Sequence, residues 1–184
     1  HSKELEESKE RDRNIINAGI TGANADMVQR YGAGIKEHIV AYEGIDNESG
    51  QQLSRSLKKI SEYKVDEEHP DTSYRQQAGF AAETKTAARE NAEKAISGDK
   101  HTRTQRTDDM DKQSDGKGNA VGGTNDQLYD IAETDANGTY ITGSGRQLKY
   151  VGNDADDCYK KLMHKDYDKY RDADAKLQVP ADYY

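Results

Sequence analysis

Two polar side chains on one predicted strand have the chemistry of a hydrolytic site. Gln147 and Lys149 are separated by one residue, and residues two apart on a strand face the same side. The amide of Gln147 and the ammonium of Lys149 should therefore project together. A lysine in such a position can orient and deprotonate a water molecule, or neutralise the charge that develops on a phosphate. The triplet Gln147-Leu148-Lys149 is therefore the first candidate for an active-site strand.

An aspartate on the preceding predicted strand could lie beside this triplet. Asp130 has apolar neighbours, and its distance along the chain from Gln147 suits two strands joined by a tight turn at residues 135–138. Across such a hairpin, the Asp130 carboxylate would approach the Gln147 amide. The alternative is that Asp130 forms a cross-strand ion pair with Arg146 or Lys149 on a solvated face of the sheet.

A second carboxylate lies in an alanine-rich predicted helix. Phe80, Glu83 and Ala87 share one helical face that should pack inward. A buried carboxylate is costly unless it is paired, hydrogen-bonded or bound to a metal. Ligation of one metal ion by Glu83, Asp130 and the Gln147 carbonyl oxygen would remove that cost, and hard oxygen ligands of this kind suit Mg²⁺ or Mn²⁺. The alternative is that Glu83 is a partly exposed helix residue.

The N-terminal part of the chain is predicted to be helical. Residues 24–43 have apolar side chains at spacings of mostly three and four residues, which predicts an amphipathic helix, broken or kinked near residues 32–34. Residues 51–63 continue helically with a stripe of apolar side chains. Residues 76–97 form the alanine-rich helix, and Gly98 is a suitable C-cap.

The apolar pattern changes period after residue 100, which indicates a change from helices to strands. The expected elements are an extended segment at 101–107, a mobile glycine-rich loop at 110–125, strands at 127–134 and 139–151, a helix at 155–172 and a strand at 176–179. A helical region over residues 1–72 would precede a core over residues 73–184. This order of elements predicts an α+β fold, or an α/β fold with a mixed sheet.

Composition limits the choice of function. The 184-residue chain has a formal net charge of −8, which counts against a protein that binds a polyanion. Its single cysteine excludes an intramolecular disulfide, and no His and Cys spacing suits zinc. No apolar run approaches the ~20 residues that a membrane span requires. Basic residues near the predicted site reduce the charge objection and favour a short or folded substrate; they are Lys100, Arg103, Arg106, Lys112, Lys117, Arg146 and Lys149.

The order of a helix glutamate, a strand aspartate and a Gln-x-Lys strand resembles the PD-(D/E)xK nuclease superfamily. The matching motifs are residues 79–83 (GFAAE), residues 129–131 (YDI) and residues 145–149 (GRQLK). The resemblance covers residues 76–180 and is to the variant that has glutamine in the motif. This chain departs from the family pattern because no proline precedes Asp130, and Asp126 or Asp108 could take the aspartate role.

The resemblance implies both a fold and an activity. The implied fold is a restriction-endonuclease-like mixed sheet flanked by helices. The implied activity is metal-dependent hydrolysis of phosphodiester bonds in DNA or RNA, with tRNA among the candidate substrates. Glu83, Asp130 and Gln147 would hold Mg²⁺ or Mn²⁺, and Lys149 would assist the attacking water.

A second resemblance is architectural. A polar helical lead before a small core is similar to the C-terminal toxin modules of bacterial contact-dependent inhibition and related polymorphic toxin systems. It implies that the chain is part of a larger delivered protein, acts in the cytoplasm and is bound by a cognate immunity protein. The alternative is a non-catalytic interaction or immunity-type protein of a phage or mobile element.

Overall fold

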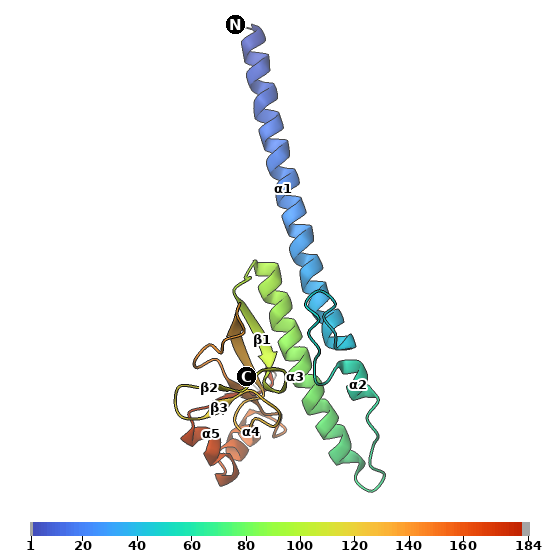
Figure 1. Ribbon diagram of the computed structural model, residues 1–184, viewed down its shortest axis with the longest axis vertical. Coiled ribbons are helices and arrows are strands. Elements are labelled where there is room, and N and C mark those ends of the chain that lie inside the picture. Colours follow the sequence, from blue (N-terminus) through green and yellow to red (C-terminus); the bar gives the residue numbers. More distant parts are fainter. Residues whose placement is uncertain (1, 182–184) are drawn as a thin grey trace.

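A long helix projects from a mixed body of helices and strands (Figure 1). The computed structural model describes residues 2–181, and side chains from residue 6 onward. Helix α1 (Ser2–Glu43) contains the predicted helix 24–43 but runs without interruption through Gly32 and Gly34, so the predicted kink is wrong. A Cβ atom at Gly34 would lie 3.2 Å from Ile96 of the neighbouring helix. The packing that this glycine permits offsets its low helix propensity.

The next helices differ from the prediction in length. Residues 44–56 form turns, and only α2 (Leu57–Ser61) is helical, so the predicted helix 51–63 is mostly wrong. Helix α3 (Pro70–Ser97) begins earlier than residue 76 because proline fits the first turn of a helix, where its missing N–H costs nothing. It ends as predicted at Gly98, which adopts a left-handed conformation with φ of 84°.

Four strands form one mixed sheet in the order β1-β4-β5-β6. Strand β4 (Ile131–Asp135) pairs antiparallel with β1 (Thr102–Arg106) and with β5 (Arg146–Leu148), and β6 (Lys176–Gln178) pairs parallel with β5. The chain crosses from β5 to β6 through α4 (Ala155–Leu162), a 3₁₀ turn (Lys165–Tyr167) and α5 (Asp168–Asp172). The predicted α+β class with an N-terminal helical region is therefore confirmed.

The predicted hairpin is shorter than expected. Its turn is present, since the Gly138 N–H donates to the Asp135 carbonyl at 3.0 Å, but the predicted strands 127–134 and 139–151 are reduced to β4 and β5. Between them the chain makes one bridge and then loops away through residues 141–145. The Tyr140 hydroxyl stabilises this loop by accepting the N–H groups of Gly143 and Gly145.

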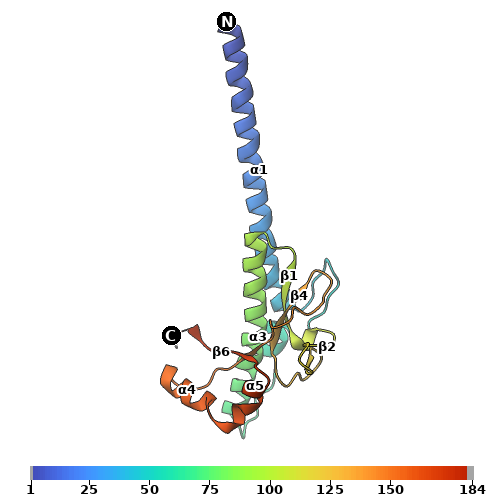
Figure 2. The ribbon, with the colours of Figure 1, turned by 90° about the vertical axis from the view of Figure 1, so that its left-hand side faces the viewer.

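Two further predicted segments are subdivided. The predicted loop 110–125 contains a small hairpin of β2 (Gln113–Ser114) and β3 (Ala120–Val121), preceded by a 3₁₀ turn (Thr107–Asp109). The predicted helix 155–172 is divided into α4 and α5 by residues 163–167. Both views place α4 and α5 at the end of the molecule opposite the N-terminus (Figures 1 and 2).

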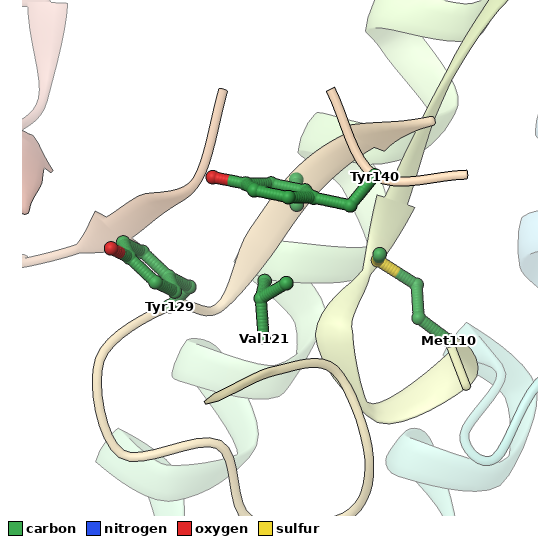
Figure 3. Close-up of a cluster of buried hydrophobic side chains, with 5 residues drawn as sticks. Met110, Val121, Tyr129 and Tyr140 are labelled. Atoms are coloured by element: carbon green, nitrogen blue, oxygen red, sulfur yellow. The ribbon is translucent and has the colours of Figure 1, made fainter. Parts of the chain in front are cut away.

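An apolar cluster covers one face of the sheet. Met110, Val121, Tyr129, Ala132 and Tyr140 are buried against one another (Figure 3). The small β2–β3 hairpin contributes Val121, which is fully buried. Ala132 belongs to the cluster, whereas its neighbour Glu133 contacts α3, because successive strand residues point to opposite faces. This cluster therefore lies on the sheet face away from α3, while Ile131 and alanines of α3 are buried on the other face.

A set of polar contacts, which we call the polar seam, joins α3 to the other face of the sheet. Glu90 binds Arg146 at 2.6 and 2.8 Å, and Lys94 binds Glu133 at 3.0 Å. The Asn91 amide donates to the Thr104 carbonyl and accepts the Thr104 N–H, both at 2.8 Å. Asn91 thus pairs the outward-facing backbone of edge strand β1, where a further strand would otherwise bind. The polar seam consists of Glu90, Asn91, Lys94, Thr104, Glu133 and Arg146.

The C-terminal part of α1 belongs to the body. It packs along α3, and Glu37 binds Arg103 of β1 at 3.0 and 2.8 Å. These contacts cross the division between residues 72 and 73, which stays a prediction. Within the described residues, no helix has both the length and the apolar character needed to cross a membrane.

Asn91→Ala should destabilise the fold. The substitution leaves a buried N–H and a buried C=O of Thr104 without partners, which should cost about 2–4 kcal/mol in unfolding free energy. Urea unfolding followed by circular dichroism measures the change. Glu93→Ala, on the exposed side of the same helix, is the control and should change stability by less than ~0.5 kcal/mol. Equal stability of the two variants would show that Asn91 does not stabilise the edge strand.

Candidate active site

The structure brings Asp130 and Gln147 into direct contact. Asp130 lies in a bend immediately before β4, and its backbone N–H donates to the Arg146 carbonyl at 2.9 Å. Its side-chain Oδ2 accepts the Gln147 amide at 2.5 Å and the Leu148 backbone N–H at 2.8 Å. The hydrogen-bond ladder between β4 and β5 therefore continues through the side chain of Asp130. These bonds hold the Asp130 carboxylate beside Gln147.

Glu83 approaches the same point from α3. Its side chain is 16% exposed and accepts the Arg106 Nε–H at 3.3 Å, so this half-buried carboxylate faces the body of the protein. Burial and the negative charge of Asp130 raise the pKa of Glu83 to about 7, although Arg106 opposes the shift. Burial also raises the pKa of Asp130, against the Leu148 N–H and the Lys149 charge. The two carboxylates therefore influence each other electrostatically.

Lys149 follows β5 directly and lies at the edge of this pair. Its backbone N–H donates to the Gln178 carbonyl at 2.9 Å, and its ammonium lies 5.0 Å from the centre of the Tyr170 ring. Its positive charge lowers the pKa of Asp130, so the ammonium acts on the carboxylate without contacting it. Arg146 binds Glu90 instead, which removes the alternative of an ion pair between Arg146 and Asp130.

The two other aspartates that could compete for the aspartate role have different partners. Asp108 accepts Arg55 at 2.9 Å and Arg106 at 3.0 Å through one oxygen. Asp126 accepts backbone N–H groups of residues 122, 128 and 129 and so stabilises the turn before Asp130. Asp130 is therefore the aspartate that contacts Gln147.

Arg106 lies beside Glu83, a contact that the sequence does not predict. The Arg106 side chain is 2% exposed and contacts Glu83, Asp108 and Asp109, the last at 3.5 Å. The sequence predicts only that Arg106 lies in the extended segment 101–107 and is one of several basic residues near the site. Neither the face to which it points nor its distance from α3 follows from that segment alone.

Most of the basic residues that were predicted to lie near the site form ion pairs with carboxylates. Arg103 binds Glu37, Lys117 binds Asp174, and both Arg106 and Arg146 are in the ion pairs already described. These four side chains stabilise the protein and have their charge neutralised. Lys149 is different, because within the described residues no carboxylate lies within ion-pair distance of its ammonium.

The chemistry of the donor set fits a Mg²⁺ or Mn²⁺ ion held mainly by water. Both hydrogen bonds of Asp130 end on Oδ2, and the bond from Arg106 ends on Glu83 Oε2. Among the described residues, no fully buried side-chain N or O atom lacks a hydrogen-bond partner, so Asp130 Oδ1 and Glu83 Oε1, which accept no hydrogen bond there, are not completely shielded from water. Two such oxygens suit Mg²⁺, which binds one or two carboxylates and keeps several waters. The described residues include no group of three or more His, Cys, Asp and Glu that could hold a metal alone.

Comparisons with known proteins do not assign a function. No protein-family model matches the chain, and neither a curated protein nor a solved structure is significantly similar to it. A functional assignment therefore depends on the geometry and chemistry of Glu83, Asp130, Gln147 and Lys149.

Glu83 should make stability depend on pH. Its folded-state pKa of about 7 exceeds the ordinary 4.5, so its contribution to stability is complete below pH 4.5 and is lost as pH rises through 7. Between pH 5 and 8 without metal, the wild type should lose roughly 3 kcal/mol relative to Glu83→Gln. Urea unfolding at several pH values in a chelator measures this difference. Glu93→Gln, an exposed control, should show no such change; parallel wild-type and Glu83→Gln curves would contradict the raised pKa.

Proposed function

We propose that this chain is a metal-dependent endonuclease that hydrolyses phosphodiester bonds of DNA or RNA. The observation that carries the proposal is the convergence of three separate segments. Helix α3 contributes Glu83, the bend before β4 contributes Asp130, and β5 with the residue after it contributes Gln147 and Lys149. The sequence resemblance implies this same set of four residues.

The topology also supports the proposal. Helix α3 precedes the antiparallel strands β1, β4 and β5, and a helical crossover leads to the parallel strand β6. The aspartate directly precedes the middle strand of the three, and the Gln-x-Lys triplet occupies the end of the third strand and the residue after it. A mixed sheet flanked by helices is the fold that the resemblance to PD-(D/E)xK nucleases implies.

Each of the four site residues would have its own role in phosphodiester hydrolysis. Glu83 and Asp130 would hold Mg²⁺ or Mn²⁺ through the oxygens that accept no hydrogen bond, with Gln147 beside them, and the ion would supply a Lewis acid and an activated water. Lys149 would donate hydrogen bonds to the attacking water or to a non-bridging phosphate oxygen. The hydrogen bonds of Asp130 to Gln147 and Leu148 would keep its carboxylate in place during the reaction.

The biological setting is a finer part of the proposal. We infer a toxin module whose projecting helix α1 serves delivery or anchoring, whose body acts in the cytoplasm, and which a cognate immunity protein binds. DNA and RNA, including tRNA, are both candidate substrates. The alternative of a non-catalytic interaction or immunity-type protein is separated from the nuclease by the two experiments that follow.

Lys149→Ala and Asp130→Ala should each abolish most nuclease activity. The first removes the ammonium beside the reacting phosphate and the second removes a metal ligand, and losses of at least ~100-fold in rate are expected. Cleavage of plasmid DNA, single-stranded DNA and total tRNA in Mg²⁺ or Mn²⁺ measures the effect. Lys85→Ala, an exposed lysine of α3, is the control and should cut like the wild type. Variants as active as the wild type would refute the site, and an inactive wild type would favour the non-catalytic alternative.

Mg²⁺ should stabilise the wild type through Glu83 and Asp130. Binding to the folded state alone raises stability by about 2.7 kcal/mol at 100 times the dissociation constant. The melting temperature at pH 8 should therefore rise with Mg²⁺, and should rise less at pH 6, where Glu83 is mostly protonated. Glu83→Gln and Asp130→Asn should lose the shift, whereas Glu93→Gln should keep it. An equal Mg²⁺ shift in all four proteins would place the metal elsewhere.

A further inference from the structure

Two lysines lie against one aromatic ring beside the candidate active site. The Lys149 ammonium is 5.0 Å from the centre of the Tyr170 ring, and the Lys169 ammonium is 4.8 Å from it. Tyr170 belongs to α5 and is 6% exposed, so the two lysines cover a ring that is otherwise enclosed. Lys149 comes from the end of β5 and Lys169 from α5, so two distant segments present positive charge at one place.

The two ammonium groups are not neutralised by ion pairs. In the part of the chain that the structure describes, no carboxylate lies within ion-pair distance of Lys149 or Lys169, whereas Arg103, Arg106 and Arg146 are all paired. The aromatic ring attracts both cations, which holds them close in spite of their mutual repulsion. An anion bound between or beside them would remove that repulsion.

We propose that Lys169, together with Lys149, forms a phosphate-binding subsite that directs a nucleic-acid strand from the scissile phosphate toward α5. The inference rests on the proposed function, because it takes the substrate at Asp130 to be a phosphodiester. Lys149 belongs to both places, since its charge acts on Asp130 and its ammonium contacts Tyr170. Lys169 is therefore a substrate-binding residue for a phosphate that is not cleaved.

The dimensions and charge suit this role. The two ammonium nitrogens are at most about 10 Å apart, which is no more than roughly three nucleotides at ~3.4 Å per nucleotide of one strand. A lysine binds phosphate as a point charge and does not read the base, so the subsite should act on any sequence. In a chain of net charge −8, an unpaired pair of lysines is a local attraction for a polyanion.

Salt dependence of binding tests the subsite. In an Asp130→Asn background that cannot cut, Lys169→Gln should reduce the slope of log affinity against log salt by about 0.7, the value for one lost phosphate contact on a single strand. The probes are fluorescein-labelled single-stranded RNA and DNA of one sequence, measured by anisotropy in Mg²⁺. Lys9→Gln makes the same charge change on the exposed, projecting part of α1 and should leave the slope unchanged.

Steady-state kinetics give a second measurement in the active protein. Lys169→Gln should raise KM about fourfold at physiological salt, from the loss of one phosphate contact, while kcat falls far less than in Lys149→Ala. Lys169→Arg should retain most of the affinity. If Lys169→Gln and Lys9→Gln have the same salt-dependence slope and the same KM while the wild type cuts, the subsite is wrong and the nuclease proposal stands. If the wild type neither binds the probes nor cuts them, both proposals are wrong.

Discussion

The pairing of buried polar groups between α3 and the sheet is the constraint on which the rest of the body depends. A carboxylate, an amide and an ammonium placed between a helix and a sheet must each find a partner, because an unpaired buried charge is far costlier than a lost apolar contact. Glu90, Asn91 and Lys94 meet that requirement together, each with its own partner on the sheet. The polar seam therefore fixes both the register and the rotation of α3 on the sheet.

That register determines where Glu83 lies. Glu83 is seven residues before Glu90, about two helical turns, and so it shares the sheet-facing side of α3. It meets Arg106 at the far end of β1 and acts on Asp130 at the start of β4. The residues of the polar seam stabilise the contact between α3 and the sheet. Glu83 and Asp130 lie beyond its end, and stability alone does not explain why two carboxylates lie close together there. Burial beside a like charge is one of the arrangements that raise the pKa of a carboxyl group at functional sites.

Asp130 combines a structural and a functional position. Its Oδ2 completes the pairing of β5 where the backbone of β4 bends away, and Oδ1 is not completely shielded from water. One carboxylate oxygen therefore holds the sheet together while the other is free for a ligand. The same division applies to Glu83, where Arg106 occupies one oxygen. Rigid carboxylates of this kind lose little conformational entropy when they bind a metal.

Much of the arrangement could be predicted from local sequence signals. The change from helical to strand period gave the α+β class, and the turn at residues 135–138 placed Asp130 beside Gln147. Other features depend on contacts between distant residues. The Tyr140 hydroxyl binds the loop 141–145, and α1 approaches α3 closely where Gly34 leaves space for Ile96.

The role of Arg106 is the clearest limit of a single sequence. A charged residue on a strand can point to solvent or to a buried partner, and the sequence around Arg106 is compatible with both. Its partners Asp108 and Asp109 follow it directly along the chain, whereas Glu83 comes from α3, whose position on the sheet is set by the polar seam. Only the assembled fold shows that the positive charge beside Glu83 is supplied from the protein interior.

Both faces of the sheet should be less stable at low temperature. Apolar contacts such as those of Tyr129 and Tyr140 weaken on cooling, and the desolvation cost of ion pairs such as Glu90 with Arg146 is larger in the cold because it falls on heating. Tyr129 directly precedes Asp130, while Glu83 lies on the seam side. Cooling should therefore weaken the support of both carboxylates together, whichever layer each belongs to.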